Sequence, residues 1–481
     1  MMSEQPLPHK QFSASGFLIF SFVMLFVLAT EALLPLFPND FFPYLRIGEE
    51  IIKTGHIPAT EFMTYTQFGN PAVYLYWLPS IMYFGLYKLG GPTLITIVSI
   101  FCTGAFYSFL WLSLRKLNIS RLTTGSVLVF LAVSGAAYFP ARPQLLAYPL
   151  FGLAILVILS WQNGENRLLW LLPLIALLWA NIHGSFIVLF LLLIPAIVFG
   201  SGNRKRLVFF AVISLLSTLI NYYGLDLWAS ALSMVDNPSI KLFSAEWGAP
   251  ANQDLPSYIF FMTLLLIPLL TAFTKPRIKI IYWIWYVGFG WMALTSLRYT
   301  IWFLPFEVII LSMLLDPFVE KKLQNSNHFQ NRTINMVIGI CLLIAPFAFV
   351  PGVRNHWWKE SPPIFSSTTP VEAAQWLEQN PQLPGNIWSD FNYSTYLAYA
   401  LPQRKLFMTN RFEDFTITQL EEDQRITSAK YNWRSILEKY KINLVMPSIL
   451  REPDLIMALS SSAEWKEIYR DDRAVIFVRI P

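Results

Sequence analysis

Residues Asn39 to Gly69 read NDFFPYLRIGEEIIKTGHIPATEFMTYTQFG, and they separate the first long apolar run of the chain from the next. Charged and titratable side chains are concentrated in this stretch, although the chain as a whole is poor in them. The part from 41 to 52 is too short and too charged to cross a bilayer, so it predicts an amphipathic helix at a membrane surface. Asp40 would stand at the N-terminal end of that helix.

Composition places the chain among polytopic membrane proteins. Of its 481 residues, 55% are hydrophobic and 14% are charged, and the mean hydropathy is +0.47, whereas a soluble protein carries about 25% charged residues. The net charge of +5 comes mostly from short loops, where Lys and Arg set orientation, so nucleic acid is not an expected partner. Cys102 and Cys341 lie in apolar runs and give neither a disulfide framework nor metal-ligand spacing.

Eleven apolar stretches have the length of membrane-spanning helices, about 17–25 residues. The first is too long for a signal-peptide core, so we expect it to be retained as the first span. Residues 72–89 are also apolar and aromatic, and they are either a twelfth span or a second surface helix. The eleven stretches lie at about 16–37, 91–113, 122–138, 144–161, 167–182, 184–200, 206–222, 257–274, 278–296, 299–317 and 333–350.

The positions of the basic residues decide between eleven and twelve spans. With 72–89 on the outer surface and the N-terminus in the cytoplasm, fourteen Lys and Arg before residue 351, Lys10 among them, fall inside and six fall outside. A twelfth span would invert everything after residue 90 and place the basic clusters outside, against the positive-inside rule. We therefore expect eleven spans. The segments around Arg142, from Asn181 to His183 and from Asn221 to Asp254 then lie on the outer side with residues 38–90.

The tail from Pro351 to Pro481 differs in composition from the rest, with 15 Lys and Arg, 16 Asp and Glu, and no run long enough to span a membrane. We expect two domains, a transmembrane domain over 1–350 and a small extracytoplasmic α/β domain over 351–481. Its expected helices are 370–380 and 432–440. Its expected strands are 386–389, 405–408 and 442–445, followed by a hairpin of 465–469 and 474–480 that turns at Asp471-Asp472.

Two acids in the first outer loop are candidates for chemistry. Asp40 is either a carboxylate that acts as a general base or metal ligand at the membrane surface, or the N-cap of the helix that follows. Glu61 lies between Thr60 and Thr64 and is either part of the same site or a solvated loop acid.

Two arginines stand alone at the outer ends of apolar runs. Arg142 lies between Pro140 and Pro143, and prolines restrict the residues before them, which favours a rigid turn with a positioned side chain. Arg298 follows Ser296-Leu297 at the end of another run. Each is either a ligand of a lipid phosphate or an arginine that extends to the membrane interface.

Polar residues at two further outer segments complete the candidate site. Asn181 and His183 stand where one span ends and the next begins, and they either line a wet site or close the helix hairpin with a hydrogen bond. Glu246 is either a second carboxylate, beside Trp247 as an aromatic platform for a sugar, or a solvated acid beside an interfacial tryptophan. The sequence contains no nucleotide-binding loop, zinc-protease motif or nucleophile elbow, so an enzyme here would take an activated substrate delivered through the membrane.

This order of features resembles the GT-C superfamily of membrane glycosyltransferases, in which an acid follows the first span and surface helices, many spans and an external domain come after it. Within that superfamily the chain is similar to a large bacterial branch, whose motifs occur here in order. They are Asp40, Phe42, Leu45, Gly48, Gly55, Pro58, Phe62, Thr64 to Thr66, Arg142 to Gln144, Trp179 to Gly184, Asn221 to Gly224, Glu246, Trp247 and Arg298. The branch's usual histidine four residues after the acid is Tyr44 here, and the usual Asp-x-Arg of the tail is Thr409-Asn410-Arg411.

The resemblance implies an inverting transfer of a hexose or pentose from a polyprenyl-phosphate donor to a lipid, glycan or protein acceptor outside the cytoplasm. Asp40 would deprotonate or orient the acceptor hydroxyl, and Arg142 and Arg298 would neutralise the leaving phosphate. Asn181, His183 and Glu246 would shape the sugar pocket. A divalent cation is the one cofactor to be considered, and the expected location is the inner or plasma membrane, in contact with its lipids.

Two other functions are compatible with a polytopic chain. A flippase or transporter of lipid-linked sugars would have inverted repeats or paired broken helices with midplane charges, and the sequence shows neither. A non-catalytic scaffold whose tail binds partners would not need polar residues concentrated on one side of the membrane.

Overall fold

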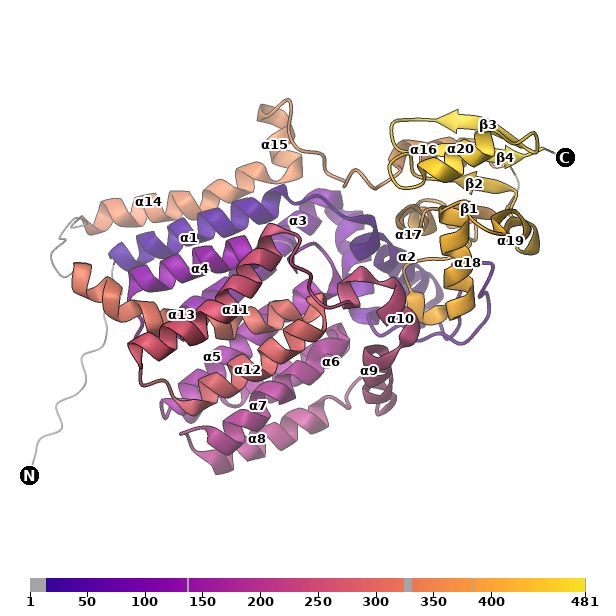
Figure 1. Cartoon of the computed structure of the whole chain (residues 1–481). Coiled ribbons are helices and arrows are strands. Elements are labelled where there is room, and N and C mark those ends of the chain that lie inside the picture. Colours follow the sequence, from indigo (N-terminus) through magenta and orange to yellow (C-terminus); the bar gives the residue numbers. More distant parts are fainter. Residues whose placement is uncertain (1–13, 136–137, 324–330, 384, 481) are drawn as a thin grey trace, which may run out of the picture.

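The computed structural model describes residues 14–135, 138–323, 331–383 and 385–480, without the side chains of residues 14, 40 and 320–323. Lys10 and residues 136 and 137 of the third expected span therefore lie outside the described residues, as do the side chains of Lys321 and Lys322. A bundle of long helices forms one part of the molecule, and a smaller domain with a sheet lies beyond one end of that bundle (Figure 1).

Every one of the eleven apolar stretches contains a helix. By length and composition, six helices of the described chain are able to cross a membrane, four shorter apolar ones accompany them, and α8 begins with three basic residues. The number that cross remains a prediction. The bundle helices are α1 (Ala14–Leu33), α3 (Trp77–Lys116), α4 (Arg121–Gly135), α5 (Tyr148–Gln162), α6 (Leu171–Ile182), α7 (Ile187–Phe199), α8 (Arg204–Ser217), α11 (Leu255–Thr274), α12 (Ile280–Thr295), α13 (Thr300–Leu323) and α14 (Arg332–Ile344).

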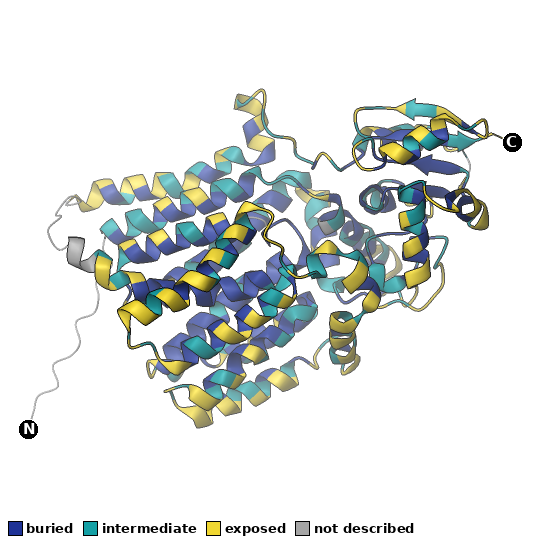
Figure 2. Cartoon of the chain, in the orientation of Figure 1, coloured by how far each residue is buried: buried dark blue, intermediate teal, exposed yellow. Residues whose placement is uncertain are grey.

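The outer faces of the bundle are apolar. Phe209 on α8, Leu265 on α11 and Val337 on α14 are 59%, 73% and 56% exposed, and Figure 2 shows exposed positions repeating along α8, α11 and α14 while the helices behind them are buried. Apolar surface of this extent marks contact with a membrane. The chain is therefore a helical membrane protein.

The first outer loop contains the two helices that the sequence predicts. The first, α2 (Pro38–Thr54), begins at a proline with Phe37 as its N-cap, so Asp40 is the third residue of the helix and the N-cap alternative for Asp40 is wrong. The second is the first part of α3, which kinks at Gly91, where φ is 57° and ψ is −152°, just before Pro92. This break falls at the boundary that charge predicted between residues 72–89 and the span from 91 onward.

The two loop helices pack closely against each other. A Cβ atom on Gly48 of α2 would lie 2.1 Å from the carbonyl oxygen of Ser80 on α3, so glycine alone permits this approach. The ring of Phe41 packs edge-on against that of Tyr83, with centroids 5.5 Å apart. The loop is thus a rigid layer over the end of the bundle.

The tail forms a four-stranded sheet in the order β1-β2-β4-β3. Strand β1 (Ile387–Ser389) is parallel to β2 (Leu444–Met446), whereas β4 (Val475–Arg479) is antiparallel to both β2 and β3 (Trp465–Arg470). The predicted hairpin and both predicted helices are present. The other helices of the tail are α15 (Pro351–Trp357), α16 (Val371–Gln379), α17 (Phe391–Ala400), α18 (Ile417–Thr427), α19 (Trp433–Lys439) and α20 (Pro453–Ser460). Two short helices, α9 (Asp226–Asp236) and α10 (Pro238–Phe243), lie in the segment between α8 and α11.

The predicted strand at 405–408 is wrong, and its segment has another role. Leu406 makes a single bridge to Ile387 of β1 and another to Thr64 of the first outer loop. Its N–H donates to the carbonyl of Met63 at 3.0 Å, and its own carbonyl accepts from the N–H of Tyr65 at 2.9 Å. The segment thus connects the loop to the sheet through single bridges at Leu406 and does not extend into a strand.

Further contacts fix the tail to the membrane domain. The Phe42 ring of α2 packs edge-on against that of Tyr396 on α17, at 4.7 Å between centroids. Arg354 is fully buried, and its guanidinium donates to the carbonyls of Ala32 at 3.1 Å and Pro362 at 2.8 Å. Because α17 lies against α2 (Figure 1), the tail domain and the first outer loop jointly cover one end of the bundle.

Candidate functional site

A cavity of about 430 Å³ lies where the bundle, the first outer loop and the tail domain meet. Five of the residues singled out from the sequence line it, although they come from four separate segments: Arg142, His183, Glu246, Trp247 and Arg298. The start of α2 contributes Asn39 and Tyr44, and the tail contributes the segment from Asn410 to Glu413. The polar segments that the sequence analysis placed at separate helix ends therefore form one site.

Arg142 is held rigidly at the edge of this cavity. The short 3-10 helix η2 (Pro143–Ala147) starts directly after Arg142. The backbone carbonyl of Arg142 accepts a hydrogen bond of 2.8 Å from the hydroxyl of Tyr83. Only 5% of Arg142 is exposed. Its Nη1 donates to both carboxylate oxygens of Glu246, each at 3.2 Å. The positioned side chain that the Pro-x-Arg-Pro pattern favoured is present.

Glu246 is the acid that faces the two predicted phosphate ligands. Burial opposes ionisation of its carboxyl, but the guanidiniums of Arg142 and Arg298 outweigh that effect and lower the pKa below its ordinary value. Glu246 is consequently an anion at neutral pH. Its side chain is nevertheless 46% exposed.

Two 3-10 turns, η5 (Ala245–Trp247) and η6 (Leu297–Tyr299), hold the residues on that side of the cavity. The Ser296 hydroxyl donates to the carbonyl of Glu246 at 3.1 Å, and the N–H of Leu297 donates to the carbonyl of Gly248 at 2.8 Å. The Arg298 guanidinium lies 5.5 Å from the centroid of the Trp247 ring. Trp247 thus carries an arginine on its face in addition to lining the cavity.

His183, between α6 and α7, is 7% exposed and lines the cavity. Its Nδ1 accepts a hydrogen bond of 3.0 Å from the N–H of Ser185, and its ring lies 5.0 Å from that of Tyr76. Burial, together with the charges of Arg298 and Arg142, holds the pKa of the imidazole well below its usual range. With Nδ1 used as an acceptor, the neutral ring carries its proton on Nε2 and offers a donor rather than a base.

Asn181 and Glu61 do not line the cavity. The amide of Asn181 donates to the carbonyls of Leu177 and Ile220, both at 2.9 Å, which joins α6 to the end of the span containing α8. Glu61 is 2% exposed rather than solvated, and its carboxylate accepts from the N–H of Met63 at 2.8 Å and from the Thr64 hydroxyl at 2.7 Å. Both side chains are used by local hydrogen bonds outside the lining of the cavity.

The side chain of Asp40 is outside what the structure describes, but the position of the residue in the chain is clear. Asn39, which directly precedes it, lines the cavity. Pro43, Tyr44 and Ile47 line it as well, and they follow Asp40 by three, four and seven residues on the same helix. That spacing repeats on a single helix face.

The tail contributes residues that were not among the sequence-based candidates. Arg411 is 7% exposed. Its Nε donates to the carboxylate of Asp414 at 2.7 Å, and its guanidinium carbon lies 4.4 Å from the centroid of the Tyr74 ring. Glu413 lies 3.6 Å from the same guanidinium, and burial raises the pKa of its carboxyl. The motif position Thr409-Asn410-Arg411 was the available signal, and its departure from the branch pattern hid it.

Gln144 is a second residue that sequence reasoning did not select. It is 2% exposed, lines the cavity, and in the described part of the chain its Oε1 has no hydrogen-bond partner. A buried amide oxygen without a partner costs about 1–3 kcal/mol. Such an atom beside a cavity indicates a ligand that completes its hydrogen bonding.

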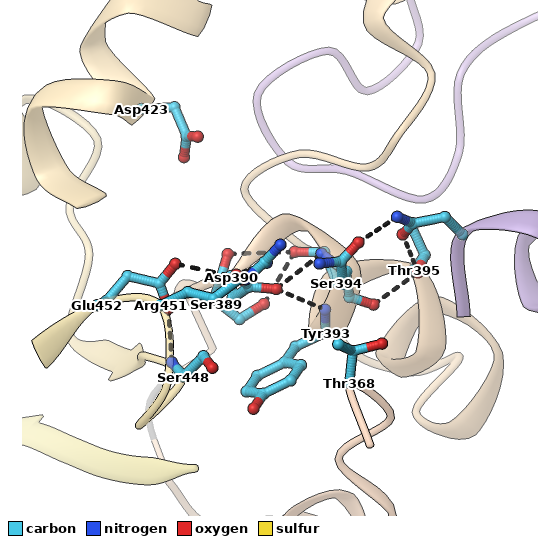
Figure 3. A network of polar contacts seen from close by, with 12 residues as sticks. Thr368, Ser389, Asp390, Tyr393, Ser394, Thr395, Asp423, Ser448, Arg451 and Glu452 are labelled. Carbon is cyan, nitrogen blue, oxygen red and sulfur yellow. Dashed lines mark hydrogen bonds and ion pairs between the residues drawn. The ribbon is translucent and has the colours of Figure 1, made fainter. Parts of the chain in front are cut away.

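A network of polar contacts lies in the tail (Figure 3). Asp390, Asp423, Arg451 and Glu452 also line a smaller cavity of about 250 Å³. Asp390 caps α17 by accepting from the N–H of Asn392 at 2.9 Å, and it forms an ion pair with Arg451. Glu452 accepts from the N–H of Ser448 at 2.6 Å, while Asp423 lies apart on α18 (Figure 3). Burial raises the pKa of Asp423 to about 7. These contacts hold the tail domain together.

The described residues supply no group of three or more His, Cys, Asp and Glu side chains arranged to hold a metal ion. We therefore derive no step through a metal. The participation of a divalent cation stays an expectation from the resemblance.

No protein-family model and no curated protein sequence matches the chain, but its fold matches solved structures. The archaeal oligosaccharyltransferase AglB from Archaeoglobus fulgidus, in complex with an inhibitory peptide and a dolichol-phosphate, gives a TM-score of 0.59. Its sequence identity is 10%, over 92% of this chain and 72% of that chain. The Archaeoglobus fulgidus oligosaccharyltransferase tethered with an acceptor peptide gives a TM-score of 0.60 at 12% sequence identity, over 96% of this chain and 74% of that chain. ArnT from Cupriavidus metallidurans in the apo state gives a TM-score of 0.51 at 14% sequence identity, over 96% of this chain and 97% of that chain.

These neighbours belong to the GT-C superfamily, and the chain has the GT-C fold. The resemblance that the sequence motifs indicated is thereby confirmed for the fold.

Proposed function

We propose that the protein is a membrane glycosyltransferase that moves a sugar from a polyprenyl-phosphate donor to an extracytoplasmic acceptor. The observation that carries the proposal is the gathering of Arg142, Arg298 and His183 in one cavity between the membrane bundle and the tail domain. Two guanidiniums and a neutral imidazole donor suit an anionic, oxygen-rich substrate. The oligosaccharyltransferase that shares this fold was solved with a dolichol-phosphate and a peptide, which supports both the donor class and an external acceptor.

In the proposed reaction the acceptor oxygen attacks the anomeric carbon of the donor sugar from the face opposite the phosphate, so the configuration inverts. Asp40 takes the hydroxyl proton as the new carbon–oxygen bond forms. The bond between the anomeric carbon and the phosphate oxygen breaks, and its electron pair leaves with the phosphate. Arg142 and Arg298 stabilise the charge that develops on the phosphate oxygens, and this requires no proton donor.

The other residues of the cavity hold the sugar. His183 donates from Nε2 to a sugar or phosphate oxygen, and Trp247 offers an apolar ring face to the sugar, which is a hexose or a pentose. The acceptor is a lipid, glycan or protein that reaches the cavity from the side of the tail domain. A cavity lined by paired charges favours catalysis over a scaffold role, since a scaffold has no use for buried guanidiniums beside a cavity.

The proposal is tested by sugar transfer from a radiolabelled polyprenyl-phosphate sugar, using protein purified in detergent. We expect Arg298→Gln and Arg142→Gln to reduce donor binding and transfer by at least about tenfold, since a hydrogen bond to a charged group contributes about 1.5–3 kcal/mol. Lys241→Ala is the matched control, because it also removes a cation, from the segment that carries Glu246, but Lys241 is 49% exposed and pairs with Asp236. Equal donor binding by the parent and both arginine variants would overturn the proposal.

A further inference from the structure

Arg142, Glu246 and Arg298 stand between two cavities. All three line the 430 Å³ cavity of the candidate site, and all three also line a second cavity of about 210 Å³ that is bounded by Tyr138 and Asp254. The carboxylate of Glu246 therefore lies where a substrate that contacts both guanidiniums would place its own negative charge.

A buried arginine needs an anion near it when the site is empty. Taking a guanidinium out of water without a counterion is costly, and Arg142 is 5% exposed. Glu246 supplies that counterion, but its two contacts of 3.2 Å are long for charge-assisted hydrogen bonds, which are usually about 2.7–2.9 Å. The pair thus compensates the charge without the short geometry of a permanent ion pair.

The backbone of Glu246 is held by a neighbouring turn, whereas its carboxylate is held through Arg142. Its carbonyl and that of Gly248 accept hydrogen bonds from Ser296 and Leu297, so η5 stays in place if the carboxylate moves. The side chain is 46% exposed, and no hydrogen bond other than those from Arg142 holds its carboxylate among the described residues. Rotation about the side-chain bonds is enough to withdraw the carboxylate from Arg142.

We propose that Glu246 is a built-in substitute for the phosphate of the substrate, which occupies Arg142 in the empty site and is displaced when the phosphate binds. This inference rests on the proposed function, because it assumes that Arg142 binds the donor phosphate. It assigns Glu246 a role different from a sugar ligand: the carboxylate lowers the affinity for every phosphate that uses Arg142.

The competition has a consequence for the reaction cycle. Transfer converts a phosphodiester with one negative charge into a phosphomonoester, whose second pKa is about 6, so the product phosphate carries more charge than the donor. Two arginines alone would hold that product tightly. Glu246 is an anion at neutral pH, and its backbone is anchored beside the two arginines. The return of its carboxylate to Arg142 therefore favours release of the polyprenyl phosphate.

The test compares binding of two probes, a polyprenyl phosphate in detergent micelles and inorganic phosphate in solution. Glu246→Gln removes the charge but keeps the size of the side chain, so we expect the polyprenyl phosphate to bind at least about tenfold more tightly and to dissociate more slowly, the low end of measured couplings between close charge pairs. Asp236→Asn is the matched control. It removes one negative charge from the same outer segment, but Asp236 is 86% exposed and pairs with Lys241, so its affinity should equal that of the parent.

Equal or weaker binding by Glu246→Gln, with the parent binding normally, overturns the inference and makes Glu246 a residue that merely positions Arg142. Failure of the parent to bind a polyprenyl phosphate contradicts the proposed function itself. A tighter complex with inorganic phosphate but not with the lipid would mean that the site takes a free phosphate. If Glu246→Gln does not fold, the variant Glu246→Asp replaces it in the test. The shorter side chain keeps the charge but reaches Arg142 less well, so the affinity of this variant for the polyprenyl phosphate should lie above that of the parent.

Discussion

The Nη1 atom of Arg142 donates to both carboxylate oxygens of Glu246 at 3.2 Å, across a sequence separation of 104 residues. This ion pair joins the turn that begins η2 to the long outer segment between α8 and α11. Each partner is positioned by a different helix-end structure, η2 for the arginine and η5 for the acid. The site therefore depends on the bundle bringing the ends of its helices together, and no single segment forms it.

Replacing Gln144 should separate substrate binding from stability. Its Oε1 lacks a hydrogen-bond partner beside the cavity, so Gln144→Leu should raise the melting temperature of the empty protein. The same change should weaken binding of the sugar donor by about tenfold, since the ligand loses a hydrogen bond that contributes about 1 kcal/mol or more. Both quantities are measured on purified protein, by thermal unfolding and by donor titration.

Gln162 provides the matched control for that experiment. It is 6% exposed at the other end of α5, and both its amide atoms lack hydrogen-bond partners among the described residues. Gln162→Leu should raise the melting temperature without any change in donor affinity. Weaker donor binding in both variants would mean that the effect of Gln144 is not local.

His183 should make the protein less stable at low pH. In the folded chain its pKa lies well below the usual range because of burial, Arg298 and Arg142, whereas in the unfolded chain it is about 6.5. The unfolded state then binds the extra proton as the pH falls below about 6.5, and the free energy of unfolding drops by about 1.4 kcal/mol per pH unit until the folded pKa is reached. Melting temperatures from pH 7.5 to 5 should show this slope in the parent.

The variant His183→Asn should remove that slope, because an asparagine oxygen still accepts from the N–H of Ser185 but does not titrate. The control is His56→Asn, since His56 is exposed in the first outer loop and its replacement should leave the slope unchanged. An identical pH dependence in the parent and in His183→Asn would contradict a neutral buried imidazole at this position.

The tail domain should be reachable from outside the cell. With the native cysteines Cys102 and Cys341 replaced by alanine, Ser367→Cys should react with an impermeant maleimide in intact cells, because Ser367 is exposed on the tail side. Ser201→Cys should not react, because Ser201 is exposed at the opposite end of the bundle beside Lys279. The reverse pattern would overturn the expected orientation. Ser201→Cys should react only after the cells are lysed, and labelling of both positions in unlysed cells would reveal that the cells leak.

The helices could be predicted from the sequence because their signals are local. Apolar runs of membrane length marked every bundle helix, and the glycine and proline at positions 91 and 92 coincide with the break that charge distribution had placed near residue 90. The segment around Leu406 was mistaken for a strand because its apolar residues face two partners at once, the first outer loop and β1. Short strands of this kind depend on tertiary contacts, which a single sequence does not show.

The site was predicted less completely for a related reason. Arg142 and Arg298 were recognisable as lone arginines at the ends of apolar runs, and Glu246 as an acid beside Trp247. Asn181 looked like an equivalent candidate, but its amide donates to the carbonyls of Leu177 and Ile220. A sequence alone does not show which way a side chain points. Arg411 could not be placed at all, because its proximity to the cavity depends on how the tail domain packs on α2.

The replacement Asp40→Asn tests the proposed base. The acceptor hydroxyl has to lose a proton, and Asp40 follows Asn39, which lines the cavity, and shares a helix face with Tyr44 and Ile47, which do as well. General base catalysis contributes roughly 10²–10⁴-fold, so we expect transfer to fall at least about 100-fold while donor binding stays nearly intact. Because Phe37 is the N-cap of α2, the variant loses no cap, only a favourable charge in the first helical turn, worth about 0.3–1 kcal/mol.

A matched acid on the same helix shows whether the effect belongs to position 40. Glu50 of α2 pairs with Arg46 at 3.0 Å, so Glu50→Gln removes one carboxylate from the same helix and should keep full transfer activity. Loss of activity in Asp40→Asn with an unchanged melting temperature and unchanged donor affinity supports the base, since a merely structural role would move one of those two quantities. Full activity in Asp40→Asn would remove Asp40 from the mechanism. Glu413 would then be the next candidate, because it is the remaining described carboxylate that lines the cavity besides Glu246, and burial raises the pKa of its carboxyl.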